Sequence, residues 1–429
     1  MGVESKETRR RDTLELVAGE AEAARDALPG LDESLVGEAL RSGAALLRSR
    51  RDEILAANAA DVRTAESRLD QGGLDRLRLD DARLEVAVAG LEATASLPQL
   101  NREVRSWRLP NGLQVSERRV PIGVVGANFE ARPNVAVDIA SQVLKSGNAV
   151  VLRTGGAALA TVTVLVDSVL RPALEEAGLP SAAVGLVRTP ERDGAEALVS
   201  LPELIPLVIL RGSGPSTAEL ARRAASNGVR TLAHAEGGGV LYVHAGASPE
   251  RLEAVVRSSL DRLGVCNRLN LVLVDRGALV QLPALVALFT ELGLEVRGTD
   301  EALSVDGVLP LDVRLGHEWA SDPDRVATVT VHVVGDLDEA LRIANDDTSA
   351  LAASIVTEDE PAAVRFLDGY RGTAAFWNAS TRFTDGFALL GTPETGVNVD
   401  RAPGPRGPVT YDDLCLRQYR VVGDGSEQR

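Results

Sequence analysis

Aromatic residues are scarce in this chain: Phe, Trp and Tyr together make up 3% of its 429 residues. The core must therefore be built mainly from Ala, Val, Leu and Ile, a composition that fits helices packed on a parallel sheet. Long apolar runs are also missing, because no stretch approaches the roughly 20 apolar residues that a membrane helix needs. The first residues carry charges and no apolar segment of signal-peptide length, so neither secretion nor membrane attachment is expected.

Cysteine and histidine are rare as well, and Lys and Arg are outnumbered by Asp and Glu. The two cysteines, Cys266 and Cys415, cannot form a disulfide framework, which favours a cytoplasmic location. The four histidines show no metal-ligand spacing and have no cysteine pair beside them, which argues against a zinc site. The net charge of −16 argues against nucleic acid or an anionic membrane as the main partner.

The pattern of apolar residues divides the chain into regions. From about Leu14 to Leu100, apolar residues recur at intervals of three and four, which predicts a helical N-terminal region. Residues 104–126 alternate polar and apolar side chains around Pro-Asn-Gly at 110–112, which predicts a β-hairpin. Strands and helices then alternate to about residue 226, which predicts a doubly wound parallel sheet with ligands at the carboxyl ends of its strands.

A second region of alternating strands and helices runs from about Gly239 to a helix that ends near Gly369. The tail beyond it is rich in Pro and Gly and ends in a strand-like run that could pair with the hairpin. We therefore predict an α/β fold of two doubly wound parallel-sheet domains with a small β flap for oligomerisation. The predicted boundaries are 1–103 with 118–238 for the first domain, 239–405 for the second, and 104–117 with 409–425 for the flap.

Two segments end a strand and begin a helix, where unpaired backbone N–H groups gather. In one, Pro133 opens a helix and Asn134 lies in its first turn. The Asn134 amide could stabilise an oxyanion or cap the helix, and spacing alone favours the cap. In the other, Arg211, Gly212 and Ser213 lead into a helix. Such a turn can bind phosphate, although it is common in α/β proteins and lacks the GxGxxG fingerprint.

Two further segments carry polar or reactive side chains. Cys266 is followed by Asn267 and Arg268. A guanidinium or exposed amides nearby could lower its thiol pKa, whereas an isolated cysteine is more often a small buried residue. Cys415 has no such setting and is expected to pack on the terminal strand. The segment 377–386, WNASTRFTDG, places hydroxyl and amide side chains around an arginine, which suits an anionic substrate and equally a hydrogen-bonded surface turn.

Together these segments resemble the aldehyde dehydrogenase superfamily, and most closely its gamma-glutamyl phosphate reductase branch. The resemblance covers nearly the whole chain. It rests on ILAANAADV near the N-terminus, RRVPIGVVGANFEARPNVAVDIASQVLKSGNAVVLR in the first α/β region, GVCN at the cysteine and NASTRFTDG near the C-terminus.

The resemblance implies NADPH-dependent reduction of L-glutamyl 5-phosphate to L-glutamate 5-semialdehyde in proline biosynthesis. It implies that Cys266 attacks the acyl phosphate, that phosphate leaves, and that hydride reduces the resulting thioester. Asn134 and the Cys266 backbone amide would stabilise the oxyanion. The residues expected on the cofactor side are Lys145, Arg153, Arg211, Gly212 and Ser213. Those expected to bind substrate are Glu130, Arg132, Asn378, Ser380, Thr381, Arg382 and Arg406. The branch also suggests a homo-oligomer that receives its small-molecule substrate from a glutamate kinase.

The chain departs from that branch around the predicted site. A Lys and a Gln-Arg-Pro-Ser run usually precede the cysteine, where this chain has SSLDRLGVCN. The histidine of a Gly-x-His-x-Asp-Ala segment is missing from NDDTSALAASIVTED. After Gly386 only Glu394 and the Arg-Gly-Pro at 406–408 keep their approximate places. Other arginines are then needed for the leaving phosphate, and the candidates are Arg262, Arg268, Arg382 and Arg406.

Two alternatives stay open at this point. An oxidoreductase of the same fold could act on a different aldehyde or acyl phosphate. If it hydrolyses its thioester, it needs a carboxylate base near the cysteine, for which Glu236 is the candidate by position along the chain. The second alternative is a non-catalytic homologue that keeps the fold as a binding subunit.

Overall fold

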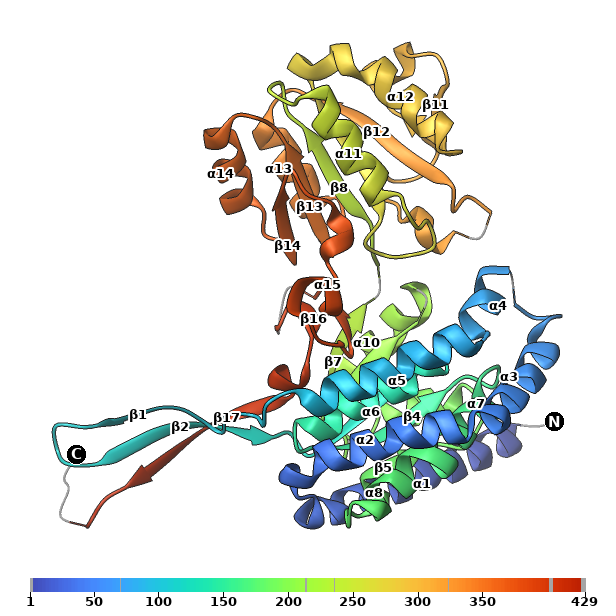
Figure 1. Ribbon diagram of the computed structural model, residues 1–429, viewed down its shortest axis with the longest axis vertical. Coiled ribbons are helices and arrows are strands. Elements are labelled where there is room, and N and C mark those ends of the chain that lie inside the picture. The colour runs from blue at the N-terminus through green and yellow to red at the C-terminus, as the bar shows by residue number, and fades with distance from the viewer. Residues whose placement is uncertain are drawn as a thin grey trace.

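The computed structural model describes residues 3–69, 71–212, 214–234, 236–322, 324–400 and 404–425. Figure 1 shows two sheet-containing bodies, one above the other, and a narrow β flap that projects sideways from the lower body. No helix in the described ranges has both the length and the apolar character needed to cross a membrane.

The lower body is built around a five-stranded parallel sheet of strand order β5-β4-β3-β6-β7. Its strands are β3 (Val124–Phe129), β4 (Ala149–Thr154), β5 (Val184–Leu186), β6 (Leu207–Arg211) and β7 (Arg230–His234). Every residue of β3 and β4 is buried. This is the property of parallel strands covered on both faces, and it explains why these strands are continuous apolar runs in the sequence.

Helices from the N-terminal region belong to the same body. They are α1 (Val3–Ala27), α2 (Glu33–Ser49), α3 (Arg51–Ala65), α4 (Gln71–Leu77) and α5 (Asp81–Ser96), which confirms the predicted helical region. The carboxylates of Asp32 and Asp80 accept hydrogen bonds from backbone N–H groups in the first turns of α2 and α5. These caps explain why the two helices begin where they do.

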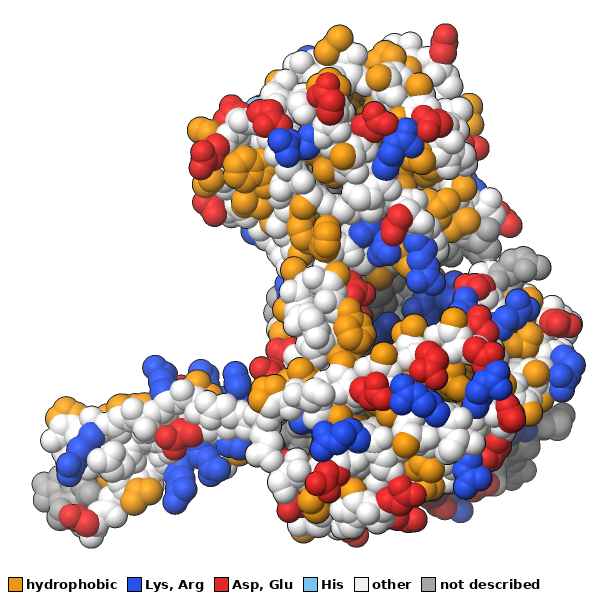
Figure 2. Space-filling view, viewed as in Figure 1, with side chains coloured by type: hydrophobic (Ala, Val, Ile, Leu, Met, Phe, Trp, Pro, Cys, Tyr) orange, Lys and Arg blue, Asp and Glu red, His pale blue; other side chains and the backbone are white. Residues whose placement is uncertain are grey.

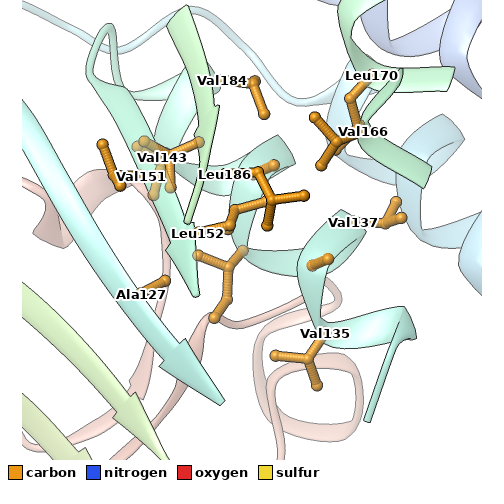
Figure 3. Close-up of a cluster of buried hydrophobic side chains, with 14 of the residues drawn as sticks. Ala127, Val135, Val137, Val143, Val151, Leu152, Val166, Leu170, Val184 and Leu186 are labelled. Atoms are coloured by element: carbon orange, nitrogen blue, oxygen red, sulfur yellow. The ribbon is translucent and has the colours of Figure 1, made fainter. Parts of the chain in front are cut away.

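The core of the lower body lies between the sheet and helix α6 (Asn134–Lys145). Figure 3 shows side chains of β3, β4 and β5 gathered with side chains of α6 and of the segment 166–170. As the sequence predicts, α6 begins directly after Pro133 and stops before Gly147, whose φ of +79° closes the helix. The strand-to-helix turn with Asn134 therefore lies at the carboxyl end of β3.

The upper body is built around a seven-stranded parallel sheet of order β11-β10-β12-β9-β8-β13-β14. Its strands are β8 (Gly239–Val243), β9 (Leu269–Asp275), β10 (Glu295–Gly298), β11 (Val308–Pro310), β12 (Thr328–Val334), β13 (Ala352–Val356) and β14 (Ala374–Trp377). Its helices are α11 (Pro249–Ser259), α12 (Leu282–Glu291), α13 (Leu337–Asp346) and α14 (Glu360–Gly369). The sequence predicts a narrower sheet, because β10, β11 and β14 are short and partly exposed and so lack a strong apolar run.

The chain crosses between the two bodies twice. The first crossing joins the end of β7 to the start of β8, so the carboxyl edge of the lower sheet is linked to the amino edge of the upper sheet. After β14 the chain returns through α15 (Gly386–Leu390), β15 (Gly396–Asn398) and β16 (Gly407–Val409). There Asn398 Oδ1 accepts a hydrogen bond from the Ala233 N–H at 3.3 Å. Figure 2 shows a hollow between the bodies, where these two sheet edges meet.

The flap is an antiparallel sheet of β1 (Glu103–Arg108), β2 (Gln114–Pro121) and β17 (Cys415–Val422). The predicted pairing of the last strand with the hairpin is confirmed, since β17 lies along β2 from Cys415 opposite Pro121 to Val422 opposite Gln114. Apolar side chains stay exposed on this element: Val104, Leu109, Leu416, Tyr419, Val421 and Val422.

Candidate active site

Cys266 lies on the loop between α11 and β9, at the amino edge of the upper sheet. Its backbone carbonyl accepts a hydrogen bond from the Gly238 N–H at 2.6 Å. Its side chain packs against an apolar cluster of Leu351, Ala352 and Val397. In the described ranges the Cys266 backbone N–H has no protein acceptor. The cysteine is thus anchored through its carbonyl, and its amide can donate to an oxyanion.

Hydroxyl side chains of the segment 377–386 hold the cysteine loop in place. Ser380 Oγ accepts a hydrogen bond from Ser259 at 2.8 Å, and Thr381 Oγ1 donates to the Asn267 carbonyl at 2.9 Å. Both side chains are buried. The sequence predicts that they contact substrate, but their hydrogen bonds instead position the residues that flank the cysteine.

Arg382, expected to bind an anionic substrate, binds the protein. Its Nε donates to Asp261 at 2.7 Å and its Nη1 donates to Asn267 Oδ1. The Asn267 amide in turn donates to the carbonyls of Arg382 and Thr384 at 3.0 and 3.1 Å. Through these donors Arg382 ties the segment to the cysteine loop, and its contact with substrate stays a prediction.

Asn378 and Arg406 are also engaged with backbone. Asn378 exchanges two hydrogen bonds with the backbone of Thr357, at 3.0 and 2.9 Å, beyond the carboxyl end of β13 and hence at the far edge of the upper sheet. Arg406 donates to the carbonyls of Arg371 and Val399. In the structure both side chains hold loops through hydrogen bonds to the backbone. A polar side chain at a strand end can bind either the protein or a ligand, and the sequence does not distinguish the two.

Charged side chains from both bodies act on the Cys266 thiol. The pKa of this thiol is raised to about 11, chiefly by burial and then by the negative charges of Glu318 and Glu394, against the opposing positive charges of Arg211 and Arg132. The thiol is therefore protonated at neutral pH. To react, it must lose its proton as substrate binds, through a base or through nearby positive charge.

Arg132 is the centre of an arginine group formed by Arg76, Arg132, Arg211 and Arg262. Burial and the positive charges of the other three lower the pKa of Arg132 to about 10. In the described part of the chain, none of the four forms an ion pair with a carboxylate. Figure 2 shows Lys and Arg side chains along the hollow between the two bodies. In a protein of net charge −16, such a group beside a thiol has the charge needed to bind an anion.

Asn134 begins α6, two residues after Arg132. Its Nδ2 donates to Asp138 Oδ2 at 3.2 Å, one turn along the same helix. Burial raises the pKa of Asp138 to about 7, while the charge of Arg211 lowers it and Glu394 raises it. Asp138, which the Asn134 amide contacts, is thus influenced by Arg211 and Glu394, two groups that also act on the thiol, and the Asn134 amide does not cap the helix.

Arg211 and Glu130, at two strand ends, lie on the sides opposite to those predicted for them. Arg211 donates through Nη1 to the Thr395 carbonyl at 2.7 Å and acts on the thiol, so it faces the catalytic side. Glu130 lies beside Gly212 and accepts a hydrogen bond from Ser216 Oγ at 3.4 Å, in the first turn of α10 (Gly214–Ser226). The structure thus places Arg211 on the side of the thiol and Glu130 on the side of α10.

Arg153 stands buried at the carboxyl end of β4. It donates to Asn128 Oδ1 at 3.0 Å and to the Glu191 carbonyl at 2.8 Å, and its Nε has no partner in the described residues. Burial lowers the pKa of Arg153, and the negative charge of Glu130 opposes this shift. Glu130 also lies next to Gly212, which is in an exposed turn. Separately, the Gly212 turn leads into the N-terminus of α10, whose N–H groups can bind the phosphates of a nucleotide.

Of the other predicted cofactor residues, Lys145 does not join this group. Ser213 lies outside the described residues. Lys145 is buried at the last position of α6. A helix that follows a strand runs back along the sheet, so Lys145 lies at the amino edge, away from the edge where such sheets bind ligands. It is therefore excluded from the candidate cofactor site.

Residues 7–294 of the chain match the aldehyde dehydrogenase family. The chain belongs to the aldehyde dehydrogenase family. It is 36% identical over 418 residues to the gamma-glutamyl phosphate reductase of Zymomonas mobilis, with 96% of both chains covered. It is 34% identical to the gamma-glutamyl phosphate reductase of Heliobacterium modesticaldum, with 96% of this chain and 98% of the relative covered. Within the aldehyde dehydrogenase family, the chain is thus a member of the gamma-glutamyl phosphate reductase branch.

Solved structures agree with this aldehyde dehydrogenase membership. The gamma-glutamyl phosphate reductase of Thermotoga maritima matches with a TM-score of 0.89 at 29% identity, covering 96% of this chain and all of that one (100%). An engineered glycolyl-CoA reductase with bound NADP+ shares the fold, with a TM-score of 0.64 at 15% identity, covering 95% and 96% of the two chains. The α/β aldehyde dehydrogenase fold predicted from the sequence is confirmed.

Sequence reasoning missed three residues of this aldehyde dehydrogenase site: Arg76, Asp138 and Glu318. Arg76 and Glu318 are far from the cysteine along the chain and belong to no motif, so only the fold brings them together. Asp138 carried a signal, because a residue four positions after Asn134 lies on the same helix face. Glu236, the base considered for hydrolysis, is exposed and forms an ion pair with Arg314.

Proposed function

We propose that the chain reduces L-glutamyl 5-phosphate to L-glutamate 5-semialdehyde and phosphate, with NADPH as reductant, in proline biosynthesis. The observation that carries this proposal is the arginine group beside Cys266. An acyl phosphate needs a nucleophile for its carbonyl carbon and positive charge for its leaving phosphate, and the site supplies both. The relatives named gamma-glutamyl phosphate reductase support the choice of substrate.

The chain's own residues suit each part of the acyl transfer. Arg132 and Arg211 bind the phosphate of the substrate, and their charge also favours the thiolate of Cys266. The sulfur attacks the carbonyl carbon, phosphate leaves, and a thioester remains on Cys266. The Cys266 backbone N–H and the Asn134 amide donate to the oxyanion that forms on the way. Removal of one such donor typically lowers kcat about 10²–10³-fold.

NADPH, when bound, supplies the hydride that reduces the thioester. Arg153, the Gly212 turn and the first turn of α10 would hold its phosphates. The charge of Arg153 at the carboxyl end of β4 and the N–H groups of a helix of 13 residues support this placement. A reductase of the same fold binds NADP+. The choice of NADPH over NADH rests on Arg153.

A dehydrogenase that hydrolyses its thioester is the competing function. The base considered for it, Glu236, is exposed and paired with Arg314. The arginine group favours phosphate over water as the partner of the thioester. This group therefore favours the reductase.

The deciding experiment is the reverse reaction. Oxidation of L-glutamate 5-semialdehyde by NADP+ should require added phosphate, because phosphate must release the acyl group from Cys266. Turnover at the same rate without phosphate would contradict the proposal. Restored growth without proline in a strain that lacks the reductase checks the same activity in a cell.

We also propose that the enzyme works in the cytoplasm on substrate from a glutamate kinase, and that the chain divides into domains at the predicted boundaries.

We further propose that the flap mediates assembly into a homo-oligomer. The projecting flap and its exposed Leu416, Tyr419 and Val421 support assembly through this element. Light scattering on the wild type and on Val421→Glu tests the assembly: the variant should have the lower mass.

A further inference from the structure

Glu318 and Cys266 converge on Gly237. A Cβ at Gly237 would stand 2.5 Å from Glu318 Oε1 and 2.6 Å from Cys266 Cβ. Only a residue without a side chain leaves room for this approach. In the described part of the chain the Glu318 carboxylate has no hydrogen bond and no ion pair, and it does not cap the short helix that starts at Trp319. The acid next to the cysteine therefore has no structural partner.

The backbone on both sides of Glu318 is held by one side chain. Asn270, on β9 directly after the cysteine loop, donates to the His317 carbonyl at 2.6 Å and accepts from the Trp319 N–H at 2.9 Å. Trp319 is fully buried (0% exposed), and its indole Nε1 donates to Thr330 Oγ1 at 2.9 Å. Buried Trp319 and the Asn270 amide therefore fix the backbone that carries Glu318, whose carboxylate lies beside the nucleophile.

The other acidic groups near the thiol are engaged elsewhere. Glu394 also acts on the thiol, but its Oε2 accepts a hydrogen bond from the Gly386 N–H at 3.0 Å. Glu236 is paired with Arg314. The remaining charged groups that act on the thiol are Arg132 and Arg211, which cannot take up a proton. Glu318 is therefore the base that the geometry offers.

We propose that Glu318 is the general base that removes the proton from the Cys266 thiol when the acyl group is transferred. The inference rests on the proposed function, because it assigns a role within that reaction. In this mechanism the arginine group binds the substrate phosphate, and Glu318 accepts the thiol proton and later returns it.

The atoms balance over one turnover. As the S–C bond forms and the C–O bond to phosphate breaks, the thiol proton moves from Sγ to the Glu318 carboxylate, and the released phosphate takes a proton from solvent. Hydride from the reductant reduces the thioester carbon, the C–S bond breaks, and the aldehyde leaves. The protonated Glu318 then returns its proton to the Cys266 thiolate.

The test measures acylation without cofactor. p-Nitrophenyl acetate acylates a reactive cysteine and releases p-nitrophenolate, so the initial burst reports the acyl transfer alone. Glu318→Gln should slow this burst about 10²–10⁴-fold, the usual contribution of a general base. The same variant should regain much of its burst as pH rises toward about 10, because the thiolate then forms without a base. Removing a negative neighbour also lowers the pKa of the thiol, which helps this recovery.

A loss of burst that high pH restores is the signature of a base. A Glu318→Gln burst at the wild-type rate would overturn the proposal, and so would a loss of the same size at every pH, which indicates displaced structure. Glu318→Asp, which keeps the carboxylate, should recover part of the burst. Asp324→Asn removes an exposed carboxylate from the same loop and should leave the burst unchanged. A wild-type burst that persists in Cys266→Ser would refute the proposed nucleophile, and so the function itself.

Discussion

Arg382 and Asn267 bind each other in both directions. The Arg382 guanidinium donates to Asn267 Oδ1, and the Asn267 amide donates to the Arg382 carbonyl at 3.0 Å. Because Asn267 directly follows Cys266, this pair joins the segment after β14 to the nucleophile. Residues without a substrate contact can therefore still control the chemistry, through the position of the sulfur.

Arg382→Ala should lower kcat about 10–100-fold with little change in KM, because a displaced nucleophile loses its alignment. The change also removes charge-assisted hydrogen bonds and should lower the free energy of unfolding by about 1–3 kcal/mol. Steady-state kinetics and denaturant unfolding measure the two effects. Arg342→Ala removes only an exposed ion pair with Asp347 and serves as the control. A rise in KM at constant kcat would instead make Arg382 a substrate ligand.

Cys266→Ser should lower turnover by at least about 10³-fold, because a hydroxyl cannot replace the thiol as nucleophile and leaving group. Cys415→Ser should stay close to wild type, since Cys415 lies on the flap strand β17. NADPH consumption measures both variants. Equal activity in Cys266→Ser and wild type would mean that the chain is a non-catalytic homologue or that its reaction does not use Cys266.

Arg132→Gln should raise the KM for phosphate in the reverse reaction about 10–100-fold, since it removes one charge-assisted contact of about 1.5–3 kcal/mol. Arg76→Gln should have a smaller effect, because Arg76 is exposed. The KM for the semialdehyde should change less than that for phosphate in both variants. The reverse pattern would assign the arginine group to the carboxylate of glutamate.

Much of the fold could be predicted because its buried elements leave strong patterns. β3 and β4 are buried along their whole length and appear as apolar runs, and Pro133 and Gly147 mark the two ends of α6. The edge and near-edge strands β10, β11 and β14 are short and partly exposed, so their pattern is weak. Local sequence thus predicts an element well only where burial is complete.

The site was harder to predict for a different reason. At the ends of β3 and β6, neighbouring residues point to opposite sides, so spacing cannot say that Arg211 faces the thiol and Glu130 faces α10. Ser380 and Arg382 belong to a motif, but a motif does not tell whether its polar groups meet a ligand or the protein. Glu318 reaches Cys266 only because the fold of the upper body brings their loops together.

Arg153→Met should weaken the binding of NADPH about 10–100-fold, because it removes a positive charge from the carboxyl end of β4, the edge where such sheets bind ligands. Methionine keeps much of the volume, and thermal unfolding checks that the fold survives. Fluorescence titration with NADPH and with NADH locates the contact. A loss for NADPH alone places Arg153 at the 2′-phosphate, an equal loss for both places it at the pyrophosphate, and unchanged affinities contradict the assignment.

Asp138→Asn should make the protein less sensitive to pH between 5 and 8. Burial raises the pKa of Asp138 to about 7, with an increase from Glu394 and decreases from Arg211 and the Asn134 hydrogen bond. A carboxyl whose pKa is raised on folding stabilises the fold while protonated, and this stability is lost as pH rises from its unfolded pKa through 7. The wild type should therefore lose about 1–3 kcal/mol more than Asp138→Asn over this range. Denaturant unfolding at pH 5 and pH 8 measures the difference for each protein, with the exposed Asp324→Asn as control. An equal loss in wild type and Asp138→Asn would mean that Asp138 is ionised throughout, and its carboxylate would then hold the Asn134 amide at every pH.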